Sequence, residues 1–159
     1  MFQFEIDISD QQSLLAVSHD RLREVIGRVL TEESIATAQI SLALVDDESI
    51  HRINREFLGH DYPTDVISFQ LNPESDIESA HESELKQLEG ELIVSTETAL
   101  REAGAHGWTA EDELILYVVH GLLHLCGYDD LTDQARPVMR QRERHMLALW
   151  HLTPTGLEA

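Results

Sequence analysis

The clearest helix in the sequence lies within residues 109–130, which read TAEDELILYVVHGLLHLCGYDD. Thr109 can cap the first turn while Asp112, three residues on, reaches back to the backbone of Thr109, as in a capping box. Apolar residues occupy nearly every side of the segment, which predicts the buried central helix of the fold. Gly127 is expected to end this helix.

Two histidines stand near the end of the helix. His120 and His124 are four residues apart, so they lie one turn apart on the same face, where both imidazoles can bind one ion. A bare pair with this spacing is more often two core histidines bonded to carbonyl groups. Here the surrounding helix is strongly apolar, and each unpaired buried imidazole would cost about 1–3 kcal/mol. A bound metal ion is therefore favoured.

A third ligand is expected just beyond the helix. After Gly127 the chain turns, and the spacing H-x-x-x-H-x-x-G-x-x-D matches an elongated zinc-binding pattern in which Asp130 replaces a third histidine. Two histidines and one carboxylate leave the fourth position of a zinc ion open, as in catalytic sites. Asp129 is the alternative ligand, or it orients a histidine instead. Cys126 is more often a small buried hydrophobic residue than a ligand.

The general base of zinc peptidases is missing. Gly121 follows the first histidine, where H-E-x-x-H peptidases carry glutamate. Ordinary peptidase chemistry is therefore disfavoured. The catalytic group stays open: water on the metal is one candidate and His60 is another.

Strands and helices interleave along the rest of the chain. The expected strands are residues 2–8, 40–45, 66–71 and 90–95. The expected helices are 20–30, 48–57, 96–105 and a last one that starts near Thr132, carries Val138 and Met139 in its apolar face, and has Pro137 in its first turn. Residues 72–87 are expected to form a mobile acidic loop. We expect a single domain over residues 1–159.

Composition and charge restrict the class of protein. An apolar fraction of 42% with 4 prolines is typical of a folded globular domain. The sequence has neither a membrane-spanning apolar run nor the start of a signal peptide, which predicts a cytoplasmic protein with no membrane partner. A formal net charge of −19 argues against a phosphate-backbone partner, although arginines gather between Arg136 and Arg144.

The segment from His120 to Asp130 closely resembles the signature of the YbeY family of bacterial ribosomal RNA maturation endoribonucleases. Two other segments resemble further motifs of that family. Residues 61–69 (DYPTDVISF) resemble its P-T-D-V-(L/I)-S-F segment, and residues 90–95 (GELIVS) resemble its G-D-I-x-I-S strand. The likeness extends roughly from residue 40 to residue 150.

The resemblance implies an α+β, zincin-like fold in which a small mixed sheet packs on a buried central helix carrying the metal ligands. It implies one Zn²⁺ ion, held by His120, His124 and Asp130. It also implies a single-strand-specific endoribonuclease that acts in 3′-end maturation of small-subunit rRNA and in ribosome quality control, with ribosomal RNA and the small ribosomal subunit as partners. The alternatives are a zinc-containing ribosome assembly factor without catalysis, and a metallohydrolase of another substrate class.

The sequence departs from the family pattern at three positions. Asp130 stands where the family has its third histidine, Leu58 where it has an arginine, and His60 where it has a lysine. The loss of two cations makes other basic residues candidates for RNA contact. These candidates are Arg55, Arg140 and Arg144.

Overall fold

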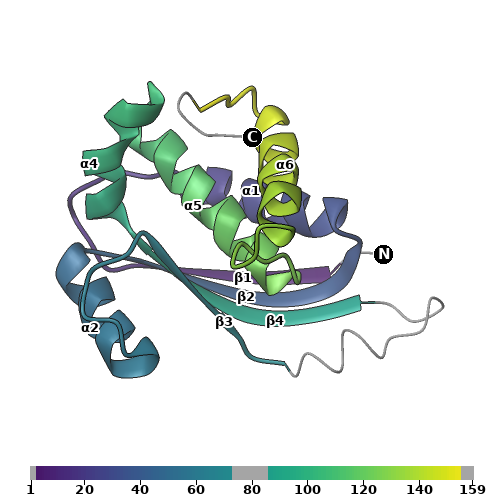
Figure 1. The fold of residues 1–159 in the computed structure, drawn as a ribbon, viewed down its shortest axis with the longest axis horizontal. Coiled ribbons are helices and arrows are strands. Elements are labelled where there is room, and N and C mark those ends of the chain that lie inside the picture. The colour runs from purple at the N-terminus through teal and green to yellow at the C-terminus, as the bar shows by residue number, and fades with distance from the viewer. Residues whose placement is uncertain (1–2, 73–85, 155–159) are drawn as a thin grey trace.

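The structure is a computed structural model that describes residues 3–72 and 86–154. In chain order the described elements are β1 (Gln3–Asp10), α1 (His19–Glu32), β2 (Ile35–Val45), α2 (Asp47–Leu58), β3 (Val66–Gln70), β4 (Lys86–Ser95), α4 (Thr96–His106), α5 (Ala110–Leu125) and α6 (Ala135–Ala148). Figure 1 shows one sheet with helices on both of its sides. Among these elements, no helix has the length and apolar character needed to cross a membrane.

The sheet has four strands in the order β1-β2-β4-β3. β1 and β4 both pair with β2 in parallel, whereas β3 pairs with β4 in the antiparallel direction. The predicted small mixed sheet is therefore confirmed. β3 ends the sheet on one side, where it packs against α5.

The two faces of the sheet are covered unequally. In Figure 1, α1, α4, α5 and α6 lie on one side and α2 lies on the other. The cross-strand register places Leu92 beside Ser68 in a row that faces α5. The next row, Ile67 beside Ile93, faces α2 and forms a small separate core with Ile50 of that helix. The larger core lies between the sheet and α1, α5 and α6.

α5 is the buried central helix that the sequence predicts. Leu114, Leu122 and Leu123 are fully buried, and burial of one such side chain stabilises the fold by roughly 1.5–3 kcal/mol. The predicted capping box is present, since Thr109 accepts a hydrogen bond from the backbone of Asp112 and the Asp112 carboxylate accepts one from the backbone of Thr109. The helix position is thus determined by packing around its whole circumference.

Two strands begin earlier than the sequence predicts. β2 begins at Ile35 rather than residue 40, and β4 begins at Lys86 rather than residue 90. The added residues of β2 and β4 pair with each other, from Ile35 with Lys86 to Gln39 with Glu89, and this pairing outweighs weak local preference. Residues 86–87, which the sequence places at the end of the expected loop, belong to β4. Residues 73–85 of that prediction lie outside the described residues.

The last helix also differs from its prediction in detail. α6 begins at Ala135, with Pro137 in its first turn as predicted. Met139 is buried, but Val138 is 56% exposed. The prediction that Val138 belongs to the packed apolar face of this helix was therefore wrong. Adjacent helix residues point about 100° apart, and α6 buries only the face that meets α5.

Candidate metal centre

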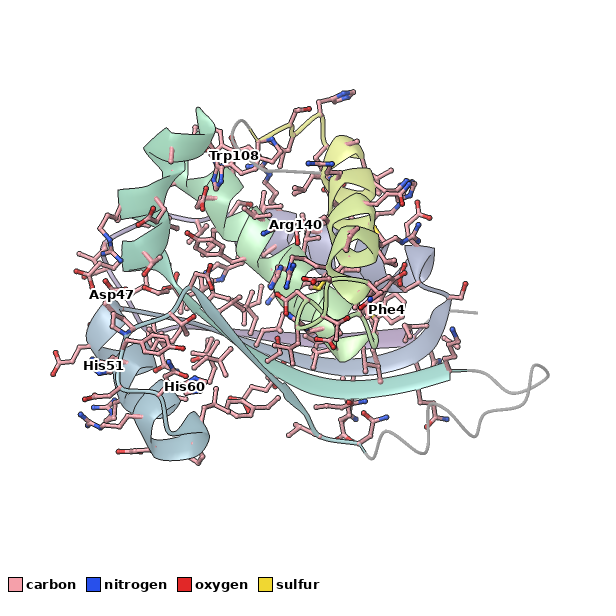
Figure 2. The ribbon with its side chains drawn as sticks, in the orientation of Figure 1. Phe4, Asp47, His51, His60, Trp108 and Arg140 are labelled. Atoms are coloured by element: carbon pink, nitrogen blue, oxygen red, sulfur yellow. The ribbon has the colours of Figure 1, made fainter. Side chains whose placement is uncertain are left out.

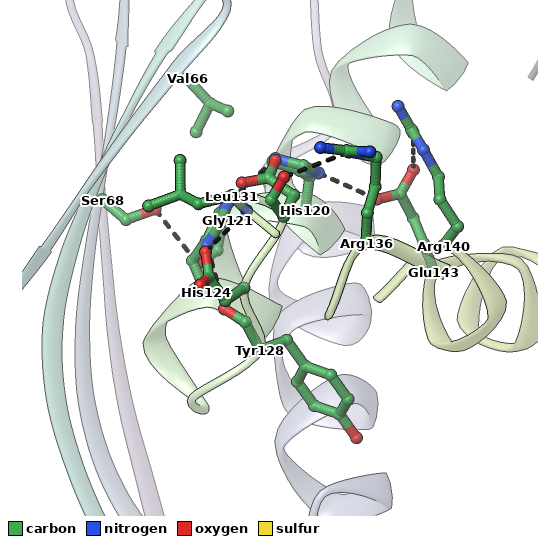
Figure 3. Close-up of polar contacts among 12 residues, drawn as sticks. Val66, Ser68, His120, Gly121, His124, Tyr128, Leu131, Arg136, Arg140 and Glu143 are labelled. Atoms are coloured by element: carbon green, nitrogen blue, oxygen red, sulfur yellow. Dashed lines mark hydrogen bonds and ion pairs between the residues drawn. The ribbon is translucent and has the colours of Figure 1, made fainter. Parts of the chain in front are cut away.

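α5 presents both predicted histidines toward one point (Figure 3). Nε2 of His120 lies 3.2 Å from Nε2 of His124, and the two rings are inclined at 80°. The helical repeat alone brings the side chains to the same face. The close approach of the two Nε2 atoms depends further on what holds the other side of each ring.

Each imidazole uses its Nδ1 atom for a separate hydrogen bond. Nδ1 of His124 donates to the carbonyl oxygen of Tyr128 at 3.1 Å, and Nδ1 of His120 donates to Oε2 of Glu143 at 2.9 Å. In the neutral rings these bonds leave a lone pair on each Nε2 atom. Two facing lone pairs repel unless a proton or a cation lies between them. Metal-ligating histidines have this arrangement of outer hydrogen bonds.

The turn after α5 brings a carboxylate to the same point. Gly127 has a φ of 104°, in the left-handed region that favours glycine. The chain reverses there, and Oδ2 of Asp130 lies 3.5 Å from Nε2 of His120 and 3.6 Å from Nε2 of His124. The three ligand-type atoms all lie within 4.8 Å of one another. This is the set of residues that the sequence predicts.

Asp129 has a different position. Its Oδ1 accepts the backbone N–H of Leu131 at 2.9 Å, which closes a local turn. The carbonyl of Asp130 accepts a hydrogen bond from Nε of Arg136 at 3.3 Å, while Nη1 of the same arginine donates to Asp133 at 3.1 Å. Arg136 therefore anchors the turn that carries the carboxylate.

Tyr128 anchors the same turn on its other side. Burial and then a hydrogen bond to Glu33 raise the pKa of the Tyr128 hydroxyl to about 12. Arg142 holds Glu33 in turn, with 2.6 Å between Nε and Oε2, and its Nη2 donates to the carbonyl of Glu32 at 3.1 Å. α1 and α6 thus position the carbonyl that orients His124.

Glu143 of α6 is the residue that sequence reasoning missed. It is only 1% exposed, and its Oε1 accepts from Nη1 of Arg140 at 3.1 Å while Oε2 accepts from His120. Burial alone would lower the pKa of His120, but the hydrogen bond and charge of Glu143 outweigh it, so the pKa is raised. One signal was available: Glu143 lies four residues after Met139 and three before Met146, on the buried face of α6.

Gly121 has a packing role that explains the absent peptidase base. A Cβ atom on Gly121 would lie 2.8 Å from Leu92 and 3.0 Å from Val66. The hydroxyl of Ser68 donates to the carbonyl of Gly121 at 3.1 Å. Since α5 lies this close to β3 and β4, the site has no room for a glutamate after His120.

A cleft of about 670 Å³ opens beside the three ligand-type atoms. β3 and the segment before it form one wall, and α5, the turn after it and α6 form the other. The charged side chains in the lining are Asp65, Asp130 and Arg140, and Leu58 lines the cleft beside them. Arg140 is therefore the one arginine or lysine that lines this cleft among the described residues.

The other predicted site residues lie apart from this cleft lining. His60 stacks on Tyr62 with ring centroids 5.4 Å apart, on the α2 side of the molecule in Figure 2. Arg55 approaches Asp61 at 4.0 Å with 57% of its side chain exposed. Arg144 is half-buried on α6. Cys126 lies outside the ligand group, and burial raises the pKa of its thiol to about 12.

The fold and this centre define a class of protein: an α+β protein in which two histidines of a buried helix and an aspartate of the turn after it gather beside an open cleft. The family model described as "Endoribonuclease YbeY" matches residues 7–151. The chain belongs to the YbeY family of endoribonucleases, which confirms the predicted family and class of enzyme.

Individual relatives agree with this assignment. Endoribonuclease YbeY of Halalkalibacterium halodurans is 37% identical over 94% of this chain and 97% of its own length. Endoribonuclease YbeY of Rhodopirellula baltica is 38% identical over 87% of this chain and 68% of its own length. The solution structure of a Thermotoga maritima protein has a TM-score of 0.62 at 25% identity, covering 96% of this chain and 99% of that one.

Proposed function

We propose that this protein is a zinc-dependent endoribonuclease that cuts single-stranded RNA in 3′-end maturation of small-subunit rRNA. The observation that carries the proposal is the convergence of two Nε2 lone pairs and the Asp130 carboxylate at the edge of an open cleft. The proposed ligands of one zinc ion are His120, His124 and Asp130. The proposed partners are ribosomal RNA and the small ribosomal subunit, in the cytoplasm.

The chemistry of the donors fits zinc. Two neutral imidazole nitrogens and one carboxylate oxygen are ligands that zinc accepts in catalytic sites. The hydrogen bonds from Nδ1 of His120 to Glu143 and from Nδ1 of His124 to Tyr128 supply the outer support that such ligands need. When bound, the ion supplies a Lewis acid for a phosphoryl oxygen.

Arg140 is proposed to bind the phosphate of the RNA. It lines the cleft from α6, and one of its nitrogens is held by Glu143 at 3.1 Å. Its remaining N–H groups have no partner among the described residues, so they can donate to phosphate oxygens. In this protein Arg140 would supply, from the opposite wall, the cation that the family has at the position of Leu58.

Asp65 is proposed to accept the proton of the attacking group. It lines the cleft but is not one of the three converging ligand-type residues. Its Oδ1 accepts the N–H of Val66 at 2.7 Å and the hydroxyl of Thr64 at 3.4 Å, which fixes the carboxylate. The other oxygen has no hydrogen-bond partner among the described residues and is available to a ligand.

The size and charge of the cleft favour one strand as the substrate. A volume of about 670 Å³ is in the range of sites for small ligands, so it admits a nucleotide of a single strand rather than a duplex. The arginines of α6 do not form a free basic surface, because Arg136, Arg140 and Arg142 pair with Asp133, Glu143 and Glu33. RNA contact is thus expected to concentrate at the cleft.

The test is metal analysis of purified variants together with cleavage of single-stranded and duplex RNA. Asp65→Asn should keep its zinc and its folding but lose about 10²–10⁴-fold in cleavage rate. Full activity in Asp65→Asn would reject Asp65 as the proton acceptor. A protein that binds zinc but cuts no RNA, and that unfolds when zinc is removed, would instead be an assembly factor with a structural metal.

Arg140 needs a variant that separates phosphate binding from support of Glu143. Arg140→Lys keeps the positive charge beside Glu143, whereas Arg140→Ala removes it. Arg140→Ala should weaken RNA binding and flatten its salt dependence by about one released counterion, and Arg140→Lys should not. Arg144→Ala is the matched change one turn further along α6, and an equal loss there would move the RNA contact to that residue.

A further inference from the structure

A second cleft adjoins the metal cleft. It has a volume of about 420 Å³ and lies between the start of α5, α4 and the segment before β3. Thr64 and Asp65 line both clefts, so the two clefts lie side by side at these residues. Tyr117, which lines the second cleft, precedes His120 by three residues on α5. That spacing is about 4.5 Å along the helix axis, within the reach of neighbouring nucleotides of one strand.

A buried carboxylate held by hydrogen bonds lines this cleft. Glu113 is 1% exposed, and its Oε1 accepts from Nδ1 of His106 at 2.6 Å and from Nε1 of Trp108 at 2.7 Å. Burial and then a hydrogen bond to Glu113 raise the pKa of the Tyr117 hydroxyl. His106 and Trp108 pack edge to face with ring centroids 5.4 Å apart. Figure 2 shows Trp108 where α4 gives way to α5.

The polar groups that face the cleft suit a base rather than a phosphate. Three carboxylates line it, those of Asp65, Glu102 and Glu113. The guanidinium of Arg101 also lines it, but its Nη1 is held by Asp47 at 2.8 Å and its Nε lies 3.6 Å from Oε1 of Glu102. A phosphate would meet net negative charge. An amino group on a base would meet carboxylate acceptors, which is how acidic side chains read N4 of cytosine.

One ring nitrogen of His106, which lines the cleft, is not used in the bond to Glu113. Because Nδ1 of His106 is bonded to Glu113, its Nε2 atom is the one left for a ligand, and it has no hydrogen-bond partner among residues 3–72 and 86–154. The ring itself offers a surface on which a base can stack. The cleft therefore combines acceptors for an amino group with an aromatic surface.

We infer that the second cleft binds the nucleobase next to the cleaved phosphate and prefers a base with an exocyclic amino group, such as cytosine, over uracil. This inference rests on the proposed RNA cleavage. Cytosine and uracil have the same ring size, but cytosine donates through N4 where uracil only accepts through O4. Discrimination between them thus isolates the role of the carboxylates.

The experiment compares cleavage of oligocytidine and oligouridine of equal length. The wild type should cut oligocytidine about fivefold faster at low substrate concentration, the factor expected of one additional base contact. Glu102→Ala should bring the ratio close to one. Glu24→Ala, an equal loss of charge at an exposed position on α1, should keep the wild-type ratio. The ratio cancels general charge effects because both substrates carry the same phosphates.

A binding measurement separates failure of the inference from failure of the proposed function. Cytidine and uridine are titrated separately into isotope-labelled protein, and amide chemical shifts are followed. Equal cleavage of both oligonucleotides by the wild type would overturn the inferred base preference and still support the proposed endoribonuclease activity. If neither is cut, the proposed function fails. Shifts at Thr64 and His106 with cytidine alone, lost in Glu102→Ala, would then still support the base site, and their absence would overturn it.

Discussion

Two buried glutamate–histidine pairs on this chain look alike and differ in what surrounds them. Glu143 accepts from Nδ1 of His120 at 2.9 Å, and Glu113 accepts from Nδ1 of His106 at 2.6 Å, with both glutamates 1% exposed. Nε2 of His120 faces His124 and Asp130, whereas His106 belongs to no group of converging ligand-type residues in the described part of the chain. A supported imidazole becomes a candidate metal ligand only where other ligands converge on it.

The largest expected contrast is in metal content. His124→Ala should lose its zinc and its RNA cleavage, because only three protein ligands are proposed. His106→Gln should keep a full equivalent of zinc. The measurement is elemental analysis of both purified variants after dialysis against a weak chelator. Equal zinc in the two proteins would show that the convergence on α5 does not bind the metal.

Removal of the proposed third ligand, Asp130, tests the explanation of why the two pairs differ. Asp130→Ala removes the carboxylate that lies 3.5 Å from Nε2 of His120 and should lower zinc stoichiometry markedly. Asp129→Ala should lose only the hydrogen bond to Leu131, about 1 kcal/mol of stability, and keep its zinc. Retention of zinc in Asp130→Ala with loss in Asp129→Ala would reverse the assignment of the carboxylate.

The glutamates themselves should have separable effects. Glu143→Gln should weaken zinc affinity by about 10–100-fold, since it weakens the support of a ligand. Glu113→Gln should leave zinc affinity unchanged and instead cost about 1–3 kcal/mol of folding free energy through an imperfectly satisfied buried cluster. Competition with a coloured chelator gives the affinities, and denaturant unfolding gives the stabilities. A loss of zinc affinity in Glu113→Gln would mean that the two pairs are coupled.

The smallest expected effect concerns pH in the metal-free protein. The pKa of His120 is raised in the folded state, so protonation of His120 favours folding. Its contribution is complete below the ordinary histidine pKa of about 6.5 and is lost as pH rises through the higher folded value. Glu143→Gln should flatten this dependence. Denaturant midpoints of the wild type and of Glu143→Gln between pH 5 and 9 would measure it. A wild-type midpoint that rises with pH relative to that of Glu143→Gln would contradict the expected direction.

Local spacing in the sequence was enough to predict that the two histidines lie on one face of a helix. A helix repeats every 3.6 residues, and His120 and His124 differ by four. It was also enough for the end of α5, since Gly127 occupies a backbone conformation that disfavours other residues. The same holds for the buried character of α5. These features depend on residues close together in the chain.

Contacts between distant residues required the tertiary structure. Glu143 follows His120 by 23 positions and Glu33 precedes Arg142 by 109, and no local period encodes such pairs. The position of the Asp130 carboxylate beside the two histidines, where that of Asp129 does not lie, depends on the direction of the turn after α5. The role of Gly121 depends on how closely β3 and β4 approach the helix. Packing of α6 and the sheet against α5 decided these features, since it is the core that brings separated segments within hydrogen-bond distance.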